Sequence, residues 1–458
     1  LFFFYSYERL KDEQEATRVR VVPLPTLGQG IVRFRNSLGA VVSVNATDFA
    51  QMYPATISAG SPQAQNTAAV AALAAAAAKY TANDFTVGDS TSSTLLNTAG
   101  YRFNAPINAE QNNHVLKLDY NLTQNQQIFA RGVYIYDKSL QAPNFPDTPA
   151  PGLWSHPTGI ATGHTWTINN NMVNNFRYGL TRASFTQLGD SGENEVFFRF
   201  IYSPKLFTRD ISRVTPVHNI TDDFSWVVNN HTLQFGTNLR YISNQKTDFA
   251  VAYDRAFTNP SFYPQAAITG PLNTYLTATR GYTVGGSDSS NAENAITAVL
   301  GRFTQYSSNF TFNNDGTLLT SGSPTVRDFR TEEYDFYVQD SWKLSNSLTL
   351  NLGLRYGISR PVYEKNGFEV APTVSLGELF EKRAIGAAAG VPFNTPVILD
   401  VSGPANNRPP LYKWDKNNFQ PSISVAWNPS FEGGFLGAMF GKNGESVFRG
   451  GFRVTNDY

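Results

Sequence analysis

One segment of the chain alternates apolar and polar residues with a period of two from Glu332 to Tyr356, interrupted only by the short polar stretch Ser345–Ser347. The apolar positions are Tyr334, Phe336, Val338 and Trp342 in the first arm and Leu348, Leu350, Leu352, Leu354 and Tyr356 in the second. A period of two places the apolar side chains on one face of a strand and the polar side chains on the other. The segment therefore predicts a β-hairpin with one apolar and one polar face.

The same layout occurs five times, and the connections between the strands alternate strictly between long and short. The first four short connections are Leu122–Asn125, Asn169–Asn171, Asn229–His231 and Ser345–Ser347, and the fifth, Pro429–Glu445, is longer and rich in glycine. The long connections are predicted at residues 10–113, 137–162, 186–215, 243–330 and 359–417. This alternation is typical of an antiparallel transmembrane β-barrel with short periplasmic turns and long extracellular loops. We therefore predict an all-β barrel domain over residues 1–458.

The composition fits this prediction. Charged residues make up 16% of the chain, against about 25% in an average soluble domain. Aromatic residues make up 14%, while the mean hydropathy of −0.29 is too low for a helical membrane protein. The 36 basic and 36 acidic residues form no basic stripe, so no nucleic-acid partner is expected. The sequence contains no cysteine, which excludes disulfides and thiolate metal sites.

The pattern contains eleven predicted strands, from Leu1–Arg9 to a last strand that starts near Ser446. Single-chain bacterial barrels normally have an even number of strands, and eleven is half of the roughly twenty-two in plugged outer-membrane transporters. We therefore expect part of a larger barrel, which taken alone would be an open sheet with its first and last strands as edges. The Ala-rich run Ala68–Ala78 is too short to span a bilayer, and we predict a helix near Thr67–Tyr80 within the first loop.

Aromatic residues gather near the ends of the predicted strands. They are Tyr120, Tyr136, Trp166, Trp226, Tyr241, Trp342, Tyr356 and Trp427. Tyrosine and tryptophan place an apolar ring against lipid and a polar tip against water, so these residues predict aromatic belts at the two membrane interfaces. The alternative is that they belong to the core of a soluble β-sandwich.

Several segments resemble the barrel of TonB-dependent outer-membrane receptors, and most closely its Oar-like branch. They are residues 112–134, 230–241, 334–357 and 417–429 and the closing SVFRGGFR at 446–453, with DSWKLSNSLTLNLGLRY as the most specific stretch. The resemblance implies a 22-stranded barrel filled by a plug domain and coupled to the inner membrane through TonB. No plug, TonB box or final strand ending in an aromatic residue is recognised in this sequence. We therefore expect the plug and the TonB contact to be supplied by regions missing from this chain.

Other candidate motifs have simpler interpretations. The glycine-rich stretch 433–441 lacks the spacing of a phosphate-binding loop, and no helix pattern follows it, so a turn is expected there. The five histidines, His114, His156, His164, His218 and His231, show no metal-ligand spacing and are interpreted as solvated or interfacial residues. Asp222 and Asp223 are adjacent and would face opposite sides of a strand, which excludes a catalytic pair.

Acidic and basic residues near the strand ends are the remaining candidates. Glu332, Glu333 and Asp335 are expected to form a solvated rim, with a cation site as the alternative. Arg131, Arg177, Arg240 and Arg355 fall near the middle or the end of their strands, often in the polar phase, and we favour pairing with acids of the lumen over contact with an anionic solute. We predict no catalytic, cofactor-binding or metal-binding residue, no cofactor and no enzyme activity, and we leave the ligand-binding residues open.

The function that the resemblance implies is uptake of a scarce, unidentified solute across the bacterial outer membrane. Outer-membrane lipid would be the main partner of the barrel. Loops commonly carry binding residues, so residues 243–330 and 359–417 are the expected ligand contacts. The alternative is a soluble, surface-exposed all-β adhesion or glycan-binding protein, whose connections would not need to alternate in length.

Overall fold

The computed structural model describes residues 1–53, 65–260, 268–442 and 444–456. Parts of the predicted loops 10–113 and 243–330, and one residue of the Pro429–Glu445 connection, lie outside these described residues.

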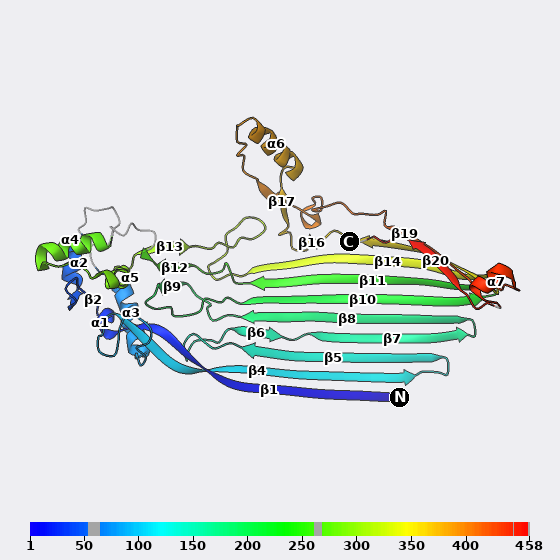
Figure 1. The fold of residues 1–458 in the computed structure, drawn as a ribbon, viewed down its shortest axis with the longest axis horizontal. Coiled ribbons are helices and arrows are strands. Elements are labelled where there is room, and N and C mark those ends of the chain that lie inside the picture. Colours follow the sequence, from blue (N-terminus) through cyan, green and yellow to red (C-terminus); the bar gives the residue numbers. More distant parts are fainter. Residues whose placement is uncertain (54–64, 261–267, 443, 457–458) are drawn as a thin grey trace.

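A single 13-stranded sheet dominates the fold, and eleven of its strands are those predicted from the sequence (Figure 1). They are β1 (Phe2–Pro23), β4 (Thr98–Asn121), β5 (Gln126–Leu140), β7 (Thr158–Asn169), β8 (Met172–Leu188), β10 (Ile211–Val228), β11 (His231–Asp248), β14 (Thr325–Ser345), β15 (Leu348–Ser359), β19 (Phe419–Trp427) and β20 (Phe448–Arg453). Each pairs antiparallel with the next in the chain. Within the described residues the sheet is open, and β1 and β20 are its edges, as predicted.

The other two strands of the sheet are short. β6 (Gly152–Ser155) lies between the ends of β5 and β8, beyond the end of β7, and β16 (Tyr363–Glu364) adds to β14. Both extend the sheet on the side of the long connections. They therefore leave the order of the eleven main strands unchanged.

The tight turns lie where the sequence predicts them. β4 and β5 are separated by residues 122–125, β7 and β8 by 170–171, β10 and β11 by 229–230, and β14 and β15 by 346–347. Asn229 has a φ of 52°, the left-handed conformation that short hairpin turns require and that asparagine tolerates. The β19–β20 connection differs from the prediction, because it contains the helix α7 (Gly434–Phe440). Seven residues bracketed by glycines are too few to show a helical period in the sequence.

The strands extend well beyond the predicted boundaries on the side of the long connections. β1 and β4 pair without interruption from Phe2 opposite Asp119 to Pro23 opposite Thr98, so the predicted loop 10–113 is much too wide. The predicted loops 137–162, 186–215 and 243–330 are also too wide, because β5, β8, β10, β11 and β14 run into them. The sequence signal fails there for a physical reason. Alternation marks a strand with one apolar face, whereas these extensions carry polar residues on both faces, as at the adjacent residues Lys11 and Asp12 of β1.

Described parts of three long connections fold together into one body, which we call the loop cap and define as residues 24–53, 65–97, 189–210, 249–260 and 268–324. Its helices are α1 (Pro25–Gly28), α2 (Ala46–Met52), α3 (Thr67–Lys79), α4 (Thr269–Arg280), η4 (Gly286–Asp288) and α5 (Ser289–Val299). Its strands are β2 (Val32–Arg35), β3 (Val41–Val44), β9 (Glu195–Phe198), β12 (Arg255–Thr258) and β13 (Phe303–Ser307). In Figure 1 the loop cap lies at one end of the main sheet, and α7 lies at the other end.

The loop cap has its own hydrophobic core. Phe34, Phe49, Leu73, Leu272 and Ile296 are fully buried in one cluster, which Phe198 and Ile201 join. Polar contacts also connect the separate connections: the Arg35 amide donates to Asp288 over 2.8 Å, and Arg280 pairs with Asp48 over 2.7 Å. Burial of apolar area from three connections stabilises an arrangement that none of them would form alone.

The Ala-rich segment forms the predicted helix. α3 spans Thr67–Lys79, and the side chain of Asn66 accepts a hydrogen bond from the amide of Ala69 as an N-terminal cap. Leu73 is fully buried in the core of the loop cap. No helix among the described residues is both long and apolar enough to cross a membrane.

The connection from β15 to β19 carries its own short elements, and the side chain of Asn314 in the loop cap donates a hydrogen bond to its Asn366 carbonyl over 3.0 Å. It carries β17 (Val370–Pro372), α6 (Leu376–Ala388), β18 (Leu399–Val401) and η5 (Pro404–Asn406). The carboxylate of Glu364, at its start, is fully buried and accepts hydrogen bonds from the amides of Asp328, Asn366 and Phe368, each over 2.8 Å. This carboxylate therefore ties the connection to β14.

A glycine in β11 provides a test of how the polar side of the sheet packs. A Cβ on Gly236 would lie 2.2 Å from Cε1 of Tyr337, whose hydroxyl donates to Asp223 over 2.7 Å. We expect Gly236→Ala to displace this ring and to lower the free energy of unfolding by about 1–3 kcal/mol, measured by urea titration in detergent micelles. Gly132→Ala is the matched control, since nothing lies within 4 Å of its Cβ. Equal unfolding curves for the two variants would contradict the packing described here.

Candidate functional site

The main sheet has one apolar face that remains exposed. Residues directly opposite each other on paired strands point to the same side, and the register aligns Phe235 with Val338 and Val338 with Leu354. Other members of this face are Leu116, Leu118, Ile160, Phe176, Phe336, Leu352, Ile423 and Val425, all of them exposed. We call this surface the apolar face. An exposed apolar surface that continues over many strands marks contact with a membrane or a protein.

All eight predicted belt residues lie on the apolar face. Tyr120, Trp166, Trp226, Trp342 and Trp427 lie toward the tight turns, and Tyr136, Tyr241 and Tyr356 lie farther toward the long connections. The core of a soluble sandwich would bury such rings, yet Trp166 and Trp427 are exposed. The two groups therefore flank a band of aliphatic and phenylalanine side chains.

The opposite side of the sheet, which we call the polar face, carries the four predicted arginines. Arg240 pairs with Glu333 over 2.8 Å, and Arg355 pairs with Asp335 over 2.9 Å. Two of the four arginines therefore form the ion pairs with acids that we favoured from the sequence. Arg131 and Arg177 form no ion pair within the described part of the chain.

The acidic residues near the start of β14 do not form one group. Glu332 lies on the apolar face, where it pairs with Arg360 over 3.1 Å, and Glu333 and Asp335 lie on the polar face. Each of the three carboxylates is partly exposed and has an arginine partner. Asp222 and Asp223 face opposite sides as predicted: Asp222 accepts from Asn174 over 2.9 Å, and Asp223 accepts from Tyr337.

The histidines are spread over the sheet rather than gathered. His114, His164, His218 and His231 lie on the apolar face, and each contacts one polar neighbour: Tyr5, Gln126, Tyr178 and Asp340, respectively. His156 contacts the hydroxyl of Ser184 over 2.8 Å. Among the residues that the structure describes, no three His, Cys, Asp or Glu side chains gather as metal ligands would.

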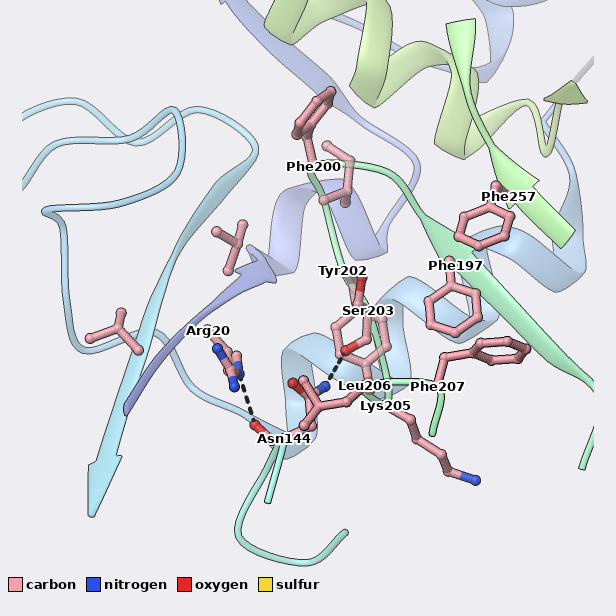
Figure 2. Close-up of a pocket in the computed structure, with 13 residues that line it drawn as sticks. Arg20, Asn144, Phe197, Phe200, Tyr202, Ser203, Lys205, Leu206, Phe207 and Phe257 are labelled. Atoms are coloured by element: carbon pink, nitrogen blue, oxygen red, sulfur yellow. Dashed lines mark hydrogen bonds between the residues drawn. The ribbon is translucent and has the colours of Figure 1, made fainter. Parts of the chain in front are cut away.

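A cavity of about 630 Å³ lies where the loop cap meets β1 (Figure 2). We call it the cap cavity. Its walls are residues 19–21 of β1, Asn144, residues 197, 200–203 and 205–207 of the β8–β10 connection, and Phe257 of β12. The side chain of Asn144 donates to the carbonyl of Ser203 over 2.7 Å, and Arg20 Nε donates to the carbonyl of Asn144 over 3.3 Å. Three separate connections and one strand therefore build this site.

A buried polar network supports the β8–β10 connection beside the cap cavity. Arg209, 4% exposed, donates through Nη1 to the hydroxyl of Ser191 over 2.7 Å and through Nη2 to the carbonyl of Glu193 over 2.9 Å. The Ser191 hydroxyl donates in turn to Glu195 over 2.6 Å, and Lys205 pairs with Glu195 over 2.9 Å. Burial alone would lower the pKa of Lys205, but its hydrogen bonds to Glu193 and Glu195 raise that pKa above its ordinary value.

Two aromatic residues of the cavity wall have unusual backbone conformations. Phe200 and Phe207 have φ values of 62° and 68°, in the left-handed region that bulky residues rarely occupy. Such strain costs of the order of 1–3 kcal/mol and persists only where surrounding contacts hold it. Here the ring of Phe207 lies beside the guanidinium groups of Arg209 and Arg255, each at 4.6 Å. The contacts of the β8–β10 connection therefore fix the shape of the cap cavity.

The two loops predicted to contact a ligand are placed differently. Residues 243–330 contribute Phe257 to the cap cavity, whereas residues 359–417 contribute nothing to it. Most of the wall comes from residues 197–207, within the predicted loop 186–215 that the sequence analysis did not single out. The run of aromatic and basic residues from Phe197 to Phe207 was the available signal. No sequence signal indicates that Arg20 lines the cavity. Its position there depends on β1 continuing far beyond its predicted end.

Comparison with known proteins gives one family match over the whole chain. A family described as "Outer membrane beta barrel domain" matches residues 1–457. No curated protein matches the sequence.

Among solved structures, the copper transporter OprC aligns with 72% of this chain and 35% of its own, at 7% identity and a TM-score of 0.34. The outer membrane transporter YddB from Escherichia coli aligns with 76% of this chain and 40% of its own, at 9% identity and a TM-score of 0.36. The ferric yersiniabactin uptake receptor FyuA from Yersinia pestis aligns with 75% and 37%, at 9% identity and a TM-score of 0.31. This chain therefore spans between 35% and 40% of the length of these three structures.

The buried network predicts that Arg209 holds the β8–β10 connection in place. We expect Arg209→Met to leave Glu195 without part of its network and to loosen residues 189–210, so that limited proteolysis cuts there at least several times faster. Arg33→Met is the matched control, because Arg33 is a half-buried arginine of the loop cap whose side chain has no hydrogen bond or ion pair in the described structure. Equal cleavage rates in the two variants would show that the network is dispensable.

Proposed function

The chain belongs to the outer membrane beta barrel domain family and lies in the bacterial outer membrane, and from this premise we propose that it is the barrel portion of a TonB-dependent transporter that takes up a scarce solute. The apolar face would contact lipid, the polar face would line the lumen, and the loop cap would lie outside the cell. A plug domain and the contact with TonB would come from residues outside 1–458.

The single observation that carries this proposal is the loop cap. Long connections that merely joined strands would not need a shared core, yet three of them bury Phe34, Phe198 and Ile296 in one cluster. Two of these connections, β8–β10 and β11–β14, also form the wall of the cap cavity, together with β1 and Asn144. Binding sites are often placed on loops that a rigid scaffold positions. A folded body with a cavity, placed at one end of the barrel strands, is suited to capture a solute before it enters the lumen.

The polar face supports the same proposal. Its arginines and acids form ion pairs such as Arg240–Glu333, which leave paired charges along a surface that water can reach. The side chain of Arg177 has no such partner in the described chain and lies opposite Thr221 in the register. A water-filled or plug-filled lumen accommodates such groups, whereas lipid does not.

The alternative, a soluble adhesion or glycan-binding protein, does not account for the apolar face. Such a protein would bury both of its apolar sheet faces in a sandwich core. Here Phe336 and Val338 are 48% and 41% exposed in the middle of the sheet. The family match over residues 1–457 favours the membrane protein as well.

Adjacent residues of β14 provide a sharp test of the assignment of the two faces. Val338 is on the apolar face between Trp342 and Tyr334, and Gln339 is on the polar face. We expect Val338→Lys to reduce folding into phospholipid vesicles by about 2–4 kcal/mol, because it places a charge near the middle of the bilayer, and Gln339→Lys to have little effect. The fraction of protease-protected protein measures both. A larger loss for Gln339→Lys would reverse the assignment.

Transport itself is tested in cells that carry the complete gene. We expect such cells to remove at least one solute from a minimal medium that gene-deleted cells leave behind, as measured by mass spectrometry of the spent medium. The protonophore CCCP should abolish the difference, since TonB-dependent uptake draws energy from the inner membrane. Identical media from the two strains would contradict transport, and a difference that survives CCCP would contradict the TonB coupling.

A further inference from the structure

We propose that the cap cavity binds a planar aromatic ring carrying one carboxylate, with Arg20 binding the carboxylate and the phenylalanines opposite it packing against the ring. This inference rests on the proposed function, because it names the class of solute that the transporter would capture. It is drawn from the charge and the shape of the cavity wall.

The volume of the cap cavity suits a small organic molecule. Its roughly 630 Å³ falls within the range of about 300–1,000 Å³ that is usual for such sites. Figure 2 shows Arg20 on one side of the cavity and Phe197, Phe207 and Phe257 on the other, with Tyr202 and Ser203 between them. A ligand that spans the cavity would therefore meet a cation at one end and rings at the other.

The charge of the cavity wall is unbalanced. The lining residues include two cations, Arg20 and Lys205, and no aspartate or glutamate. Lys205 is already paired with Glu193 and Glu195. Arg20 forms no ion pair with any described residue, and its only hydrogen bond there is the one from Nε to the carbonyl of Asn144. Arg20 is therefore the cation that remains available to a ligand.

The surroundings of Arg20 add to its preference for an anion. Burial lowers the pKa of Arg20, and the nearby charge of Arg18 lowers it further, so a negative charge on a ligand would favour the charged guanidinium. An arginine has five N–H donors, and both Nη groups of Arg20 are without a hydrogen bond to the described chain. These groups match the two oxygens of a carboxylate in a parallel, bidentate arrangement.

The opposite wall is aromatic. The rings of Phe197 and Phe257 stack with their centroids 4.9 Å apart and an interplanar angle of 16°, and Phe207 meets Phe197 edge to face at 5.5 Å. Phe200 lines a separate edge of the cavity, where its ring is 66% exposed (Figure 2). Rings in stacked and edge-to-face arrangements favour another ring as their next partner. An aliphatic or sugar carboxylate would make poorer use of this wall.

A polar group lies between the two ends. Burial raises the pKa of Tyr202 to about 12, so its hydroxyl stays protonated at neutral pH and is able to donate a hydrogen bond. A cationic ligand would be repelled by Arg20 and Arg18. A strongly hydrated ligand would lose hydrogen bonds to water against the phenylalanines, and these side chains could not replace them. The combination therefore selects a flat, apolar body with one negative charge.

Isothermal titration calorimetry with the full chain in detergent micelles tests the proposal, with 2-naphthoate as the probe. We expect saturable binding of 2-naphthoate and at least about tenfold weaker binding of naphthalene-2-carboxamide, which lacks the charge. Cyclohexanecarboxylate, which lacks the aromatic ring, should bind more weakly as well. Equal binding of the acid and its amide would overturn the role of the charge, and no binding of 2-naphthoate would overturn the proposal.

Three variants locate the site. Arg20→Gln should weaken 2-naphthoate binding about tenfold while leaving the affinity for the amide unchanged. Phe200→Ala removes an exposed ring without disturbing the core, and it should weaken both probes by roughly fivefold. Arg33→Gln removes a charge from the loop cap outside the cavity and should change nothing. Loss of binding in Arg33→Gln equal to that in Arg20→Gln would show that general charge, not this cavity, attracts the probe.

The failure of this inference and the failure of the proposed function give different results. If the chain folds into vesicles and energised uptake of some solute is found, but 2-naphthoate does not bind, only the class of solute is wrong. If 2-naphthoate binds as described but gene-carrying cells show no energised uptake, the cavity is a binding site and the transport proposal is wrong.

Discussion

The antiparallel ladder of backbone hydrogen bonds from β1 to β20 is the constraint on which the rest of the structure depends. Each main strand pairs with its neighbour in sequence, so every interior strand has a hydrogen-bonded partner on both sides over at least part of its length. A sheet whose backbone is paired in this way can place its apolar face against lipid. Lipid contains no water that could form hydrogen bonds with unpaired amides and carbonyls. The exposure of Phe336 and Val338 is acceptable for that reason, and it suits the membrane location of the family.

The ladder also decides where the loop cap lies. Because the tight turns all lie at one end of the strands, the three long connections between β1 and β4, β8 and β10, and β11 and β14 all leave the sheet at the other end. Their apolar residues are then close enough to share a core. The burial of Leu73, Leu272 and Ile296 holds the connections together, and the buried network of Arg209 shapes the one that forms most of the cap cavity.

Sequence reasoning found the strands and turns that carry a periodic signal. The hairpin around Ser345–Ser347 and the helix α3 lie where they were predicted, because alternation, short polar turns and an alanine run all reflect local preferences. It missed the extensions of β1 and β4, which face water on both sides, and it missed α7, which is too short to show a period. The arginine partners of Glu332 and Glu333 are Arg360, just after β15, and Arg240 of β11, and no local pattern in the sequence indicates either pair.

The sequence by itself determined the two-faced strands, their order and the side of the sheet on which long connections leave, because each of these follows from residues close together in the chain. Only the tertiary structure decided the candidate site. Arg20, Asn144, Tyr202 and Phe257 come from four distant segments, and nothing local in any of them indicates the others. They meet because the strand ladder fixes where each connection starts, and because burial of apolar side chains then draws the connections together.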